Sequence, residues 1–367
     1  MQNPVLNKHS VALVDSTTHR GEVEKALMSF YDVTSFDDGR DALKKLSAAP
    51  PAIIIVGEDV SPGGSLSFIR AVRGERPLSE VPILYIIDKK NFSLVADGKA
   101  AGTNDFITKP YRRSEIIKSI SRLLNASIEH EWEALPELQQ SALKGTANLF
   151  GNLADVLSTG EALPLSTVKD SVQPLVTAIE NNDFKSILDG VRNHDDYTYA
   201  HSMRVATMLS LLGHAAGFKN DEQLMLASGG LLHDVGKMMI PHHILNKPGK
   251  LDTAEFEIMK SHVPETIKYL KAAGNMPKAI FIIAEQHHEK IDGTGYPNGL
   301  KGSELNELAR MAAVVDVFSA LTDRRVYKPP MESGKAIEIM KNEMTTHLDQ
   351  NFVKMFSSIL TDADILS

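Results

Sequence analysis

Imidazole and carboxylate side chains form the strongest chemical signal in this chain, and all of them lie in its second half. They are His233, Asp234, His262, His287, His288 and Asp316. Such nitrogen and oxygen ligands suit divalent iron, manganese, nickel or zinc. Neighbouring residues on a helix point about 100° apart, so His233 and Asp234 cannot face one ion as a flat pair, but the carboxylate can bridge to a second ion. The pattern predicts two metal ions that clamp a phosphate and activate water.

The surrounding sequence indicates which elements position these residues. The mostly apolar run 224–232 precedes His233 and Asp234, which predicts that they lie at the end of a buried helix. Buried imidazole and carboxylate groups are costly unless they are paired or bound to metal. A lone His-Asp pair is otherwise an ordinary surface or capping pair. Downstream, His287 and His288 lead into the glycine-rich stretch 292–297, where glycines permit close backbone approach to a ligand.

A series of ordered motifs resembles the HD-GYP domain, whose members are phosphodiesterases of the HD superfamily that degrade cyclic dinucleotides such as cyclic di-GMP. The motifs lie at 197–202, 231–237, 241, 244–251, 260–262, 287–289, 292–297, 299–302 and 315–317, and the resemblance covers about half of the chain. It implies an all-α HD-superfamily domain at residues 189–367. It also implies that the metal ligands are His201, His233, Asp234, His262, His287, His288 and Asp316.

The resemblance implies roles for residues around the metals as well. Lys237, which is expected to follow the His-Asp pair on the same helix, matches a residue that meets the substrate phosphate and, with Asp234, takes part in catalysis. The expected substrate contacts are Gly295, Tyr296, Arg325 and Lys328. Asp196 lies five residues before His201, where some relatives complete a third metal position, although an acidic residue near a helix start also suits the helix dipole. The implied cofactors are two divalent ions, or three with Asp196, with iron or manganese expected and zinc or nickel taken up during purification.

The implied activity is hydrolysis of a cyclic dinucleotide, above all cyclic di-GMP, to a linear dinucleotide and then GMP in bacterial second-messenger signalling. Two departures from the family pattern leave an alternative open. Ser319 stands where an aspartate is usual, and Val263-Pro264-Glu265 replaces the usual sequence after His262. The alternative is a catalytically weak sensor of cyclic dinucleotides, or an interaction scaffold. A nucleotide phosphohydrolase of the HD superfamily is disfavoured by the Tyr-Pro loop.

Residues 1–125 alternate short apolar runs with amphipathic segments, which predicts a doubly wound parallel α/β sheet. The continuous apolar runs 11–14, 53–56 and 83–87 suit strands that are covered on both faces. Residues 101–110 closely resemble the fifth-strand segment of response-regulator receiver domains. We therefore expect a receiver-like domain.

The residues that would accept and bind a phosphoryl group in such a domain are altered. Counting back from Pro62 places Glu58 where the phospho-acceptor aspartate belongs, with Asp59 beside it. Ile87 stands in place of the hydroxyl residue that would bind the phosphoryl group, and it cannot donate a hydrogen bond. The main competing interpretation is an unusual phosphoryl transfer to Asp59.

Of the acidic pair that would bind magnesium, Asp15 remains and its neighbour is Ser16, while Lys109 is retained. We expect Glu58 to pair with Lys109 and hold a fixed, activated-like state. This favours a pseudo-receiver that serves dimerisation or docking to signalling proteins.

Residues 126–188 carry apolar residues at helical spacing and predict a helical linker, either a connector packed on the catalytic domain or a dimer interface.

The chain has 367 residues, 43% of them hydrophobic, enough for two or three globular domains. It contains no cysteine, which excludes disulfides, thiolate zinc sites and cysteine nucleophiles. The well-mixed net charge of −8 argues against nonspecific nucleic-acid binding. With neither a signal core in the first ten residues nor a run of about 18 apolar residues, the sequence predicts a cytoplasmic protein without membrane contact.

Overall fold

The computed structural model describes residues 9–28, 31–91, 93–159, 163–192, 194, 196–245, 247, 249–323 and 330–366, and within them all side chains but those of 113, 114, 127, 154–159, 242 and 243. The chain divides into two compact units, Met1–Ile128 and Glu129–Ser367. Helices formed by the expected linker, residues 126–188, contribute to the second unit. The three-part division remains a prediction.

The first unit is built on a sheet of five parallel strands, as the sequence predicts. They are β1 (Ser10–Val14), β2 (Asp32–Phe36), β3 (Ile53–Val56), β4 (Ile83–Asp88) and β5 (Asp105–Lys109). Their spatial order is β2-β1-β3-β4-β5, so the chain winds outward in both directions from β1 and β3. Strand β2 lies at an edge and buries only Phe36, which explains why it lacks the apolar run of the other strands.

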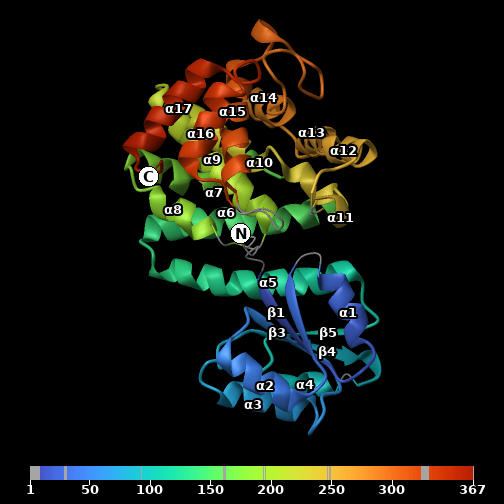
Figure 1. Ribbon diagram of the computed structural model, residues 1–367. Coiled ribbons are helices and arrows are strands. Elements are labelled where there is room, and N and C mark those ends of the chain that lie inside the picture. Colours follow the sequence, from blue (N-terminus) through green and yellow to red (C-terminus); the bar gives the residue numbers. More distant parts are fainter. Residues whose placement is uncertain are drawn as a thin grey trace. The chain divides into compact units, whose positions relative to one another are not determined.

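Helices cover both faces of this sheet (Figure 1). The chain forms α1 (Arg20–Leu27), α2 (Gly39–Ala48), α3 (Ser65–Gly74), α4 (Leu94–Ala101) and α5 (Arg113–Glu131). Leu27 of α1 and Ile120 of α5 share a core with Leu13. On the other face, α2, α3 and α4 pack in the core that contains Val14. The alternation of side chains along each parallel strand therefore feeds two apolar layers.

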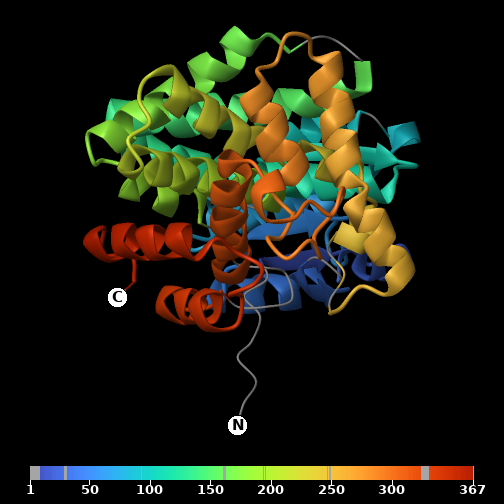
Figure 2. The same cartoon turned by 90° about the horizontal axis from the view of Figure 1, so that it is seen from above.

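The second unit is helical, as expected, and Figures 1 and 2 show its helices from two directions. Its helices are α6 (Glu137–Thr159), α7 (Leu165–Glu180), α8 (Lys185–Val191), α9 (Tyr197–Ala215), α10 (Asp221–Leu232), α11 (His242–Leu245), α12 (Thr253–Lys260), α13 (His262–Ala272), α14 (Lys278–Gln286), α15 (Glu307–Thr322), α16 (Ser333–Asn342) and α17 (Gln350–Asp362). Helices α9, α10 and α15 are buried over most of their circumference and form the centre of this unit.

The expectation that Lys237 lies on the same helix as His233 and Asp234 is wrong. Helix α10 ends at Leu232, and Lys237 lies in a 3-10 helix, η3 (Val235–Met239). Gly236 is required there, because a Cβ atom would overlap the carbonyl oxygen of His262 and lie 2.7 Å from the backbone nitrogen of Thr266. This close approach seats η3 directly on the start of α13.

Among the described residues, no helix combines the length and apolar character needed to span a membrane.

Candidate metal centre

The structure brings together seven of the eight side chains that the sequence proposed as metal ligands, all but Asp196. They form two groups, one of Asp234, His262, His287 and His288, the other of His201, His233, Asp234 and Asp316. Within each group the potential ligand atoms lie within 4.8 Å of one another. Asp234 belongs to both groups, so its two carboxylate oxygens can serve two ions. Six of the seven side chains are buried, and His288 is partly exposed.

Helix ends deliver three of the histidines. His233 directly follows α10, His287 directly follows α14, and His262 comes two residues after the end of α12. The carboxyl end of a helix carries a partial negative charge, which favours a cation within the last turn. The carboxyl ends of α10 and α14 therefore add to the attraction of a metal ion to this centre, whereas His262 is also the first residue of α13, whose amino end carries the opposite partial charge.

Hydrogen bonds fix the orientation of these rings. The Nδ1 atoms of His233 and His262 donate to the carbonyl oxygens of Gly230 and Met259, each at 2.7 Å. His287 Nδ1 donates to the carbonyl oxygen of Ala284 at 3.0 Å. Because Nδ1 holds the proton, each Nε2 atom presents a lone pair to the centre of the site.

Four buried atoms at this centre have no hydrogen-bond partner among the described residues: the Nε2 atoms of His233, His262 and His287, and Oδ1 of Asp234. His262 Nε2 lies 3.2 Å from Asp234 Oδ1, yet the two do not align as donor and acceptor. Each unsatisfied buried polar group costs roughly 1–3 kcal/mol. Converging lone pairs without protons between them are the arrangement that a divalent metal ion satisfies.

At three of the ligands, His287, His288 and Asp234, the electrostatics favour the protonation state that a metal ligand needs. Burial, with His288 and His233 nearby, holds the pKa of His287 well below its usual value. Burial also lowers the pKa of His288 to about 3, despite Asp316. Burial alone would raise the pKa of Asp234, but Lys237 and His233 hold it well below its usual value. The residues present therefore fit a site for divalent metal ions.

Asp323 supports His201 and was missed by the sequence analysis. Its Oδ2 atom accepts from His201 Nδ1 at 2.7 Å, and its Oδ1 atom lies 2.5 Å from Arg204 Nε. His201 Nε2 in turn lies 3.0 Å from Asp316 Oδ1. Burial opposes a charge on His201, but the hydrogen bonds with Asp316 and Asp323 outweigh it and raise its pKa to about 9. The spacing of seven residues between Asp316 and Asp323, two helical turns, is the signal that could have revealed this pair.

Ser319, which replaces the usual aspartate, points away from this network. Its side chain is buried, and Oγ lies 3.8 Å from Met208 Sδ. The carboxylate that supports the histidine is therefore supplied one turn further along, by Asp323.

The glycine-rich loop is held by a buried carboxylate. Glu289 accepts hydrogen bonds from the backbone nitrogens of Asn298, Gly299 and Leu300 at 2.6, 3.1 and 3.0 Å. The loop places the Tyr296 ring 4.7 Å from that of His288. Gly295 has a packing role: a Cβ atom there would lie 2.6 Å from the carbonyl oxygen of His288. The close approach at this glycine is thus to the chain itself.

Other residues proposed from the sequence lie elsewhere or are engaged differently. Asp196 caps α9 by accepting from the backbone nitrogen of Tyr199 at 3.0 Å, and it belongs to neither metal group. Lys237 pairs with Asp234. Arg325 and Lys328, the expected dinucleotide contacts, lie outside the described residues.

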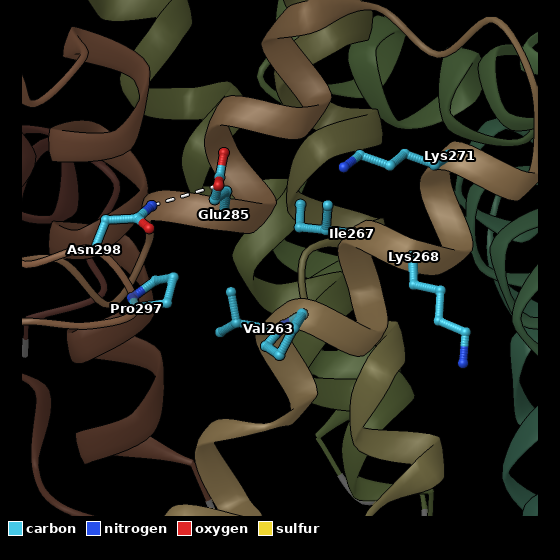
Figure 3. A pocket seen from close by; sticks show the side chains of 8 residues that line it. Val263, Ile267, Lys268, Lys271, Glu285, Pro297 and Asn298 are labelled. Carbon is cyan, nitrogen blue, oxygen red and sulfur yellow. Dashed lines mark hydrogen bonds between the residues drawn. The ribbon is translucent and has the colours of Figure 1, made fainter.

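A cavity of about 500 Å³ has Pro297 of the Tyr-Pro loop in its wall (Figure 3). Its walls are formed by Val263, Pro264, Ile267, Lys268, Lys271, Glu285, Pro297 and Asn298. Asn298 Nδ2 donates to Glu285 Oε1 at 3.4 Å across one end of the cavity. None of these residues belongs to the two metal groups.

In the first unit, the expected pair between Glu58 and Lys109 does not form among the described residues. Glu58 Oε2 instead accepts from the backbone nitrogen of Asp88 at 2.6 Å, and Oε1 accepts from the side chain of Asn91. Both partners follow or end β4, so the longer glutamate side chain reaches across the carboxyl edge of the sheet and is satisfied there. Asp15 remains buried and accepts from the backbone nitrogen of Thr17 at 2.8 Å.

Comparison with known proteins agrees with this architecture. A family model described as an HD domain matches residues 186–352. A cyclic di-GMP phosphodiesterase from Pseudomonas aeruginosa is 34% identical over 199 residues, and the alignment covers 54% of this chain and 48% of that protein. The cyclic di-GMP phosphodiesterase response regulator RpfG from Xanthomonas campestris is 29% identical, with 81% of this chain and 72% of that protein covered. The chain thus spans about half the length of the Pseudomonas relative.

A solved HDG"Y"P protein from Bdellovibrio bacteriovorus shares the fold, with a TM-score of 0.50, 18% identity, and coverage of 67% of this chain and 81% of that chain. The first unit has the doubly wound parallel sheet that the sequence predicts, and residues 186–352 match the family model of an HD domain, as the resemblance implies.

Proposed function

We propose that this protein is a metal-dependent phosphodiesterase that hydrolyses a cyclic dinucleotide, with cyclic di-GMP as the preferred substrate. The observation that carries this proposal is the pair of ligand groups that share Asp234 and contain buried Nε2 atoms without hydrogen-bond partners. The names of the relatives support the substrate class, since both act on cyclic di-GMP. The phosphates that a metal centre binds are common to cyclic di-GMP and cyclic GMP-AMP, so the metals alone do not select between these two substrates.

The proposed ligands divide between two ions around Asp234. His262, His287 and His288 would hold one ion, and the remaining group of His201, His233 and Asp316 would hold the other. Iron(II) or manganese(II) is the expected metal. When bound, the ions would lower the pKa of a water molecule and neutralise charge on the phosphate oxygens.

The protein side chains would orient this chemistry. The ammonium group of Lys237 pairs with Asp234 and places a positive charge at the edge of the centre. There it would stabilise negative charge on an oxygen of the substrate phosphate. The carbonyl bonds to Nδ1 prevent the ligand rings from rotating away. Tyr296, whose ring lies 4.7 Å from His288, would contact the sugar or a base of the substrate.

The test is turnover of cyclic di-GMP and cyclic GMP-AMP by protein prepared without oxygen and loaded with iron(II) or manganese(II), with products separated by chromatography and metal content measured in the same samples. His233→Ala and Asp234→Ala should lose metal and activity together. His214→Ala is the matched control, because His214 is an exposed histidine on α9 and should change neither. Full metal occupancy without turnover of either substrate would reject the phosphodiesterase and favour a cyclic-dinucleotide sensor or scaffold.

We propose in addition that the first unit serves as a pseudo-receiver, used for dimerisation or for docking of signalling proteins. The Glu58 carboxylate already accepts a hydrogen bond from the backbone nitrogen of Asp88 at the end of β4, and Ile87 has no hydroxyl that could bind a phosphoryl group. Incubation with acetyl phosphate should therefore leave the mass of the protein unchanged. A stable mass increase of one phosphoryl group, lost in Asp59→Ala, would show that transfer to Asp59 occurs.

A further inference from the structure

Helix α12 precedes the ligand His262 and leaves its apolar side chains open. A capping box fixes its start: Asp252 accepts from the backbone nitrogen of Glu255 at 2.9 Å, and Glu255 accepts from that of Asp252 at 2.8 Å. None of its residues is buried, and Phe256 and Ile258 are 44% and 41% exposed. A surface helix ordinarily turns its apolar side chains toward a core. The exposed ring of Phe256 therefore requires an explanation.

Phe256 is held next to the metal centre through Tyr296. The two ring centroids lie 6.0 Å apart at an interplanar angle of 84°, an edge-to-face contact. Tyr296 lies 4.7 Å from the ring of His288, which belongs to one of the metal groups. A series of contacting rings therefore runs from the metal centre to the open ring of Phe256.

A cation accompanies this aromatic pair. Lys260 Nζ lies 5.3 Å from the Phe256 centroid and 5.9 Å from that of Tyr296, within the range of cation–π attraction. Lys260 also pairs with Glu257 at 2.8 Å. The surface beside the metal centre thus combines a partly exposed aromatic ring with a positive charge. This combination matches a ligand that carries both aromatic bases and phosphates.

We infer that Phe256 is a substrate-binding residue, whose exposed ring stacks on one purine base of the cyclic dinucleotide while a phosphate lies at the metal centre. This inference rests on the proposed function and names a specific contact for it. In a cyclic dinucleotide every phosphate adjoins two nucleosides, so a base must lie close to any phosphate that the metals hold. Tyr296 bridges the two locations, and Lys260 adds charge near the sugar-phosphate ring.

The expected effect follows from the strength of base stacking on an aromatic side chain. Phe256→Ala should raise both KM and the dissociation constant of a phosphorothioate analogue that resists hydrolysis by about 5- to 150-fold. Because the stack holds the base before and during the reaction, kcat should change much less than KM. Phe256→Tyr keeps the π face and should retain an affinity close to that of the natural protein.

Ile258→Ala provides the matched control. Ile258 lies on the same helix with similar exposure, about 200° around the axis from Phe256. Its removal tests whether loss of any exposed apolar side chain from α12 disturbs His262. Metal content and melting temperature are measured for each variant, since Phe256 is not a ligand and its variants should keep both.

The outcomes separate the inference from the proposed function. A higher KM in Phe256→Ala alone, with metal content retained, supports the stacking role. Unchanged KM in Phe256→Ala, or an equal rise in Ile258→Ala, overturns the inference while turnover by the natural protein upholds the phosphodiesterase. If the fully metallated natural protein neither binds the analogue nor hydrolyses the substrate, the proposed function fails and the inference fails with it.

Discussion

Replacing Asp323 by alanine should weaken the metal centre without removing a ligand. His201 and Asp323 are both buried, so the change would leave His201 Nδ1 and the Arg204 guanidinium without their shared carboxylate. Breaking a buried charged pair by removing one partner costs about 3–5 kcal/mol. For a unit of this size the melting temperature falls by about 2–4 °C per kcal/mol, so the expected decrease is about 6–20 °C.

The same change should reduce metal affinity about 10- to 100-fold, because a carboxylate behind a ligand histidine fixes the ring and strengthens its lone pair. Affinity would be measured by competition with a fluorescent chelator, and stability by calorimetry of the metal-free protein. Asp323→Asn keeps an acceptor oxygen and should lose less of both. Ser319→Ala, one turn earlier on α15, is the control, since the hydrogen bond of its hydroxyl is to the sulfur of Met208 and not to His201. Metal affinity equal to that of the natural protein in Asp323→Ala would refute the reasoning.

Three further perturbations test other features. Chelation of the metals should lower the melting temperature, as followed by calorimetry. Metal at about 100 times its dissociation constant should restore about 2.7 kcal/mol of stability. An unchanged unfolding transition would contradict a metal site that exists only in the folded protein. Gly236→Ala should lower the free energy of unfolding by about 1–3 kcal/mol and reduce metal content, because the added Cβ atom would push η3 away from α13. Gly151→Ala is the control and should not destabilise the protein, because its Cβ atom would meet no atom within 4 Å. Burial raises the pKa of Tyr269 from 10.0 to about 12, and its buried hydroxyl lacks a partner. The folded state therefore favours the neutral phenol, so stability should fall as pH rises from 10 toward 12. Tyr269→Phe should make this fall smaller in urea titrations, and the remainder comes from the other tyrosines whose pKa values burial raises, Tyr85, Tyr111, Tyr199 and Tyr296.

The sequence predicted those parts of the molecule whose signals are local. Continuous apolar runs identified β1, β3 and β4, because strands covered on both faces need no polar alternation. Edge strand β2 alternates and buries one residue, so its pattern is too weak to separate it from a loop. The residues of the candidate metal centre could be listed because the ordered motifs around them resemble the HD-GYP domain.

Other features depend on contacts that no local pattern encodes. The partner of Asp323 lies 122 residues earlier in the chain, and the partner of Glu58 is a backbone nitrogen at the end of another strand. Lys109 was expected to bind Glu58 because opposite charges attract, but a backbone donor at 2.6 Å satisfies the carboxylate without a flexible lysine. The break between α10 and η3 likewise follows from the contact of Gly236 with α13.

The three bonds from Nδ1 to a carbonyl share one geometry, which bears on how the centre assembles. His233, His262 and His287 each donate to the residue three positions earlier, at the end of the helix that they follow. The proton is thus assigned by a few consecutive residues, before distant parts of the chain need to meet. His201 is different, because its proton is directed by a residue 122 positions away. Substitutions in the surrounding core can therefore shift these helices during evolution while each of the three rings still offers the same nitrogen to a metal.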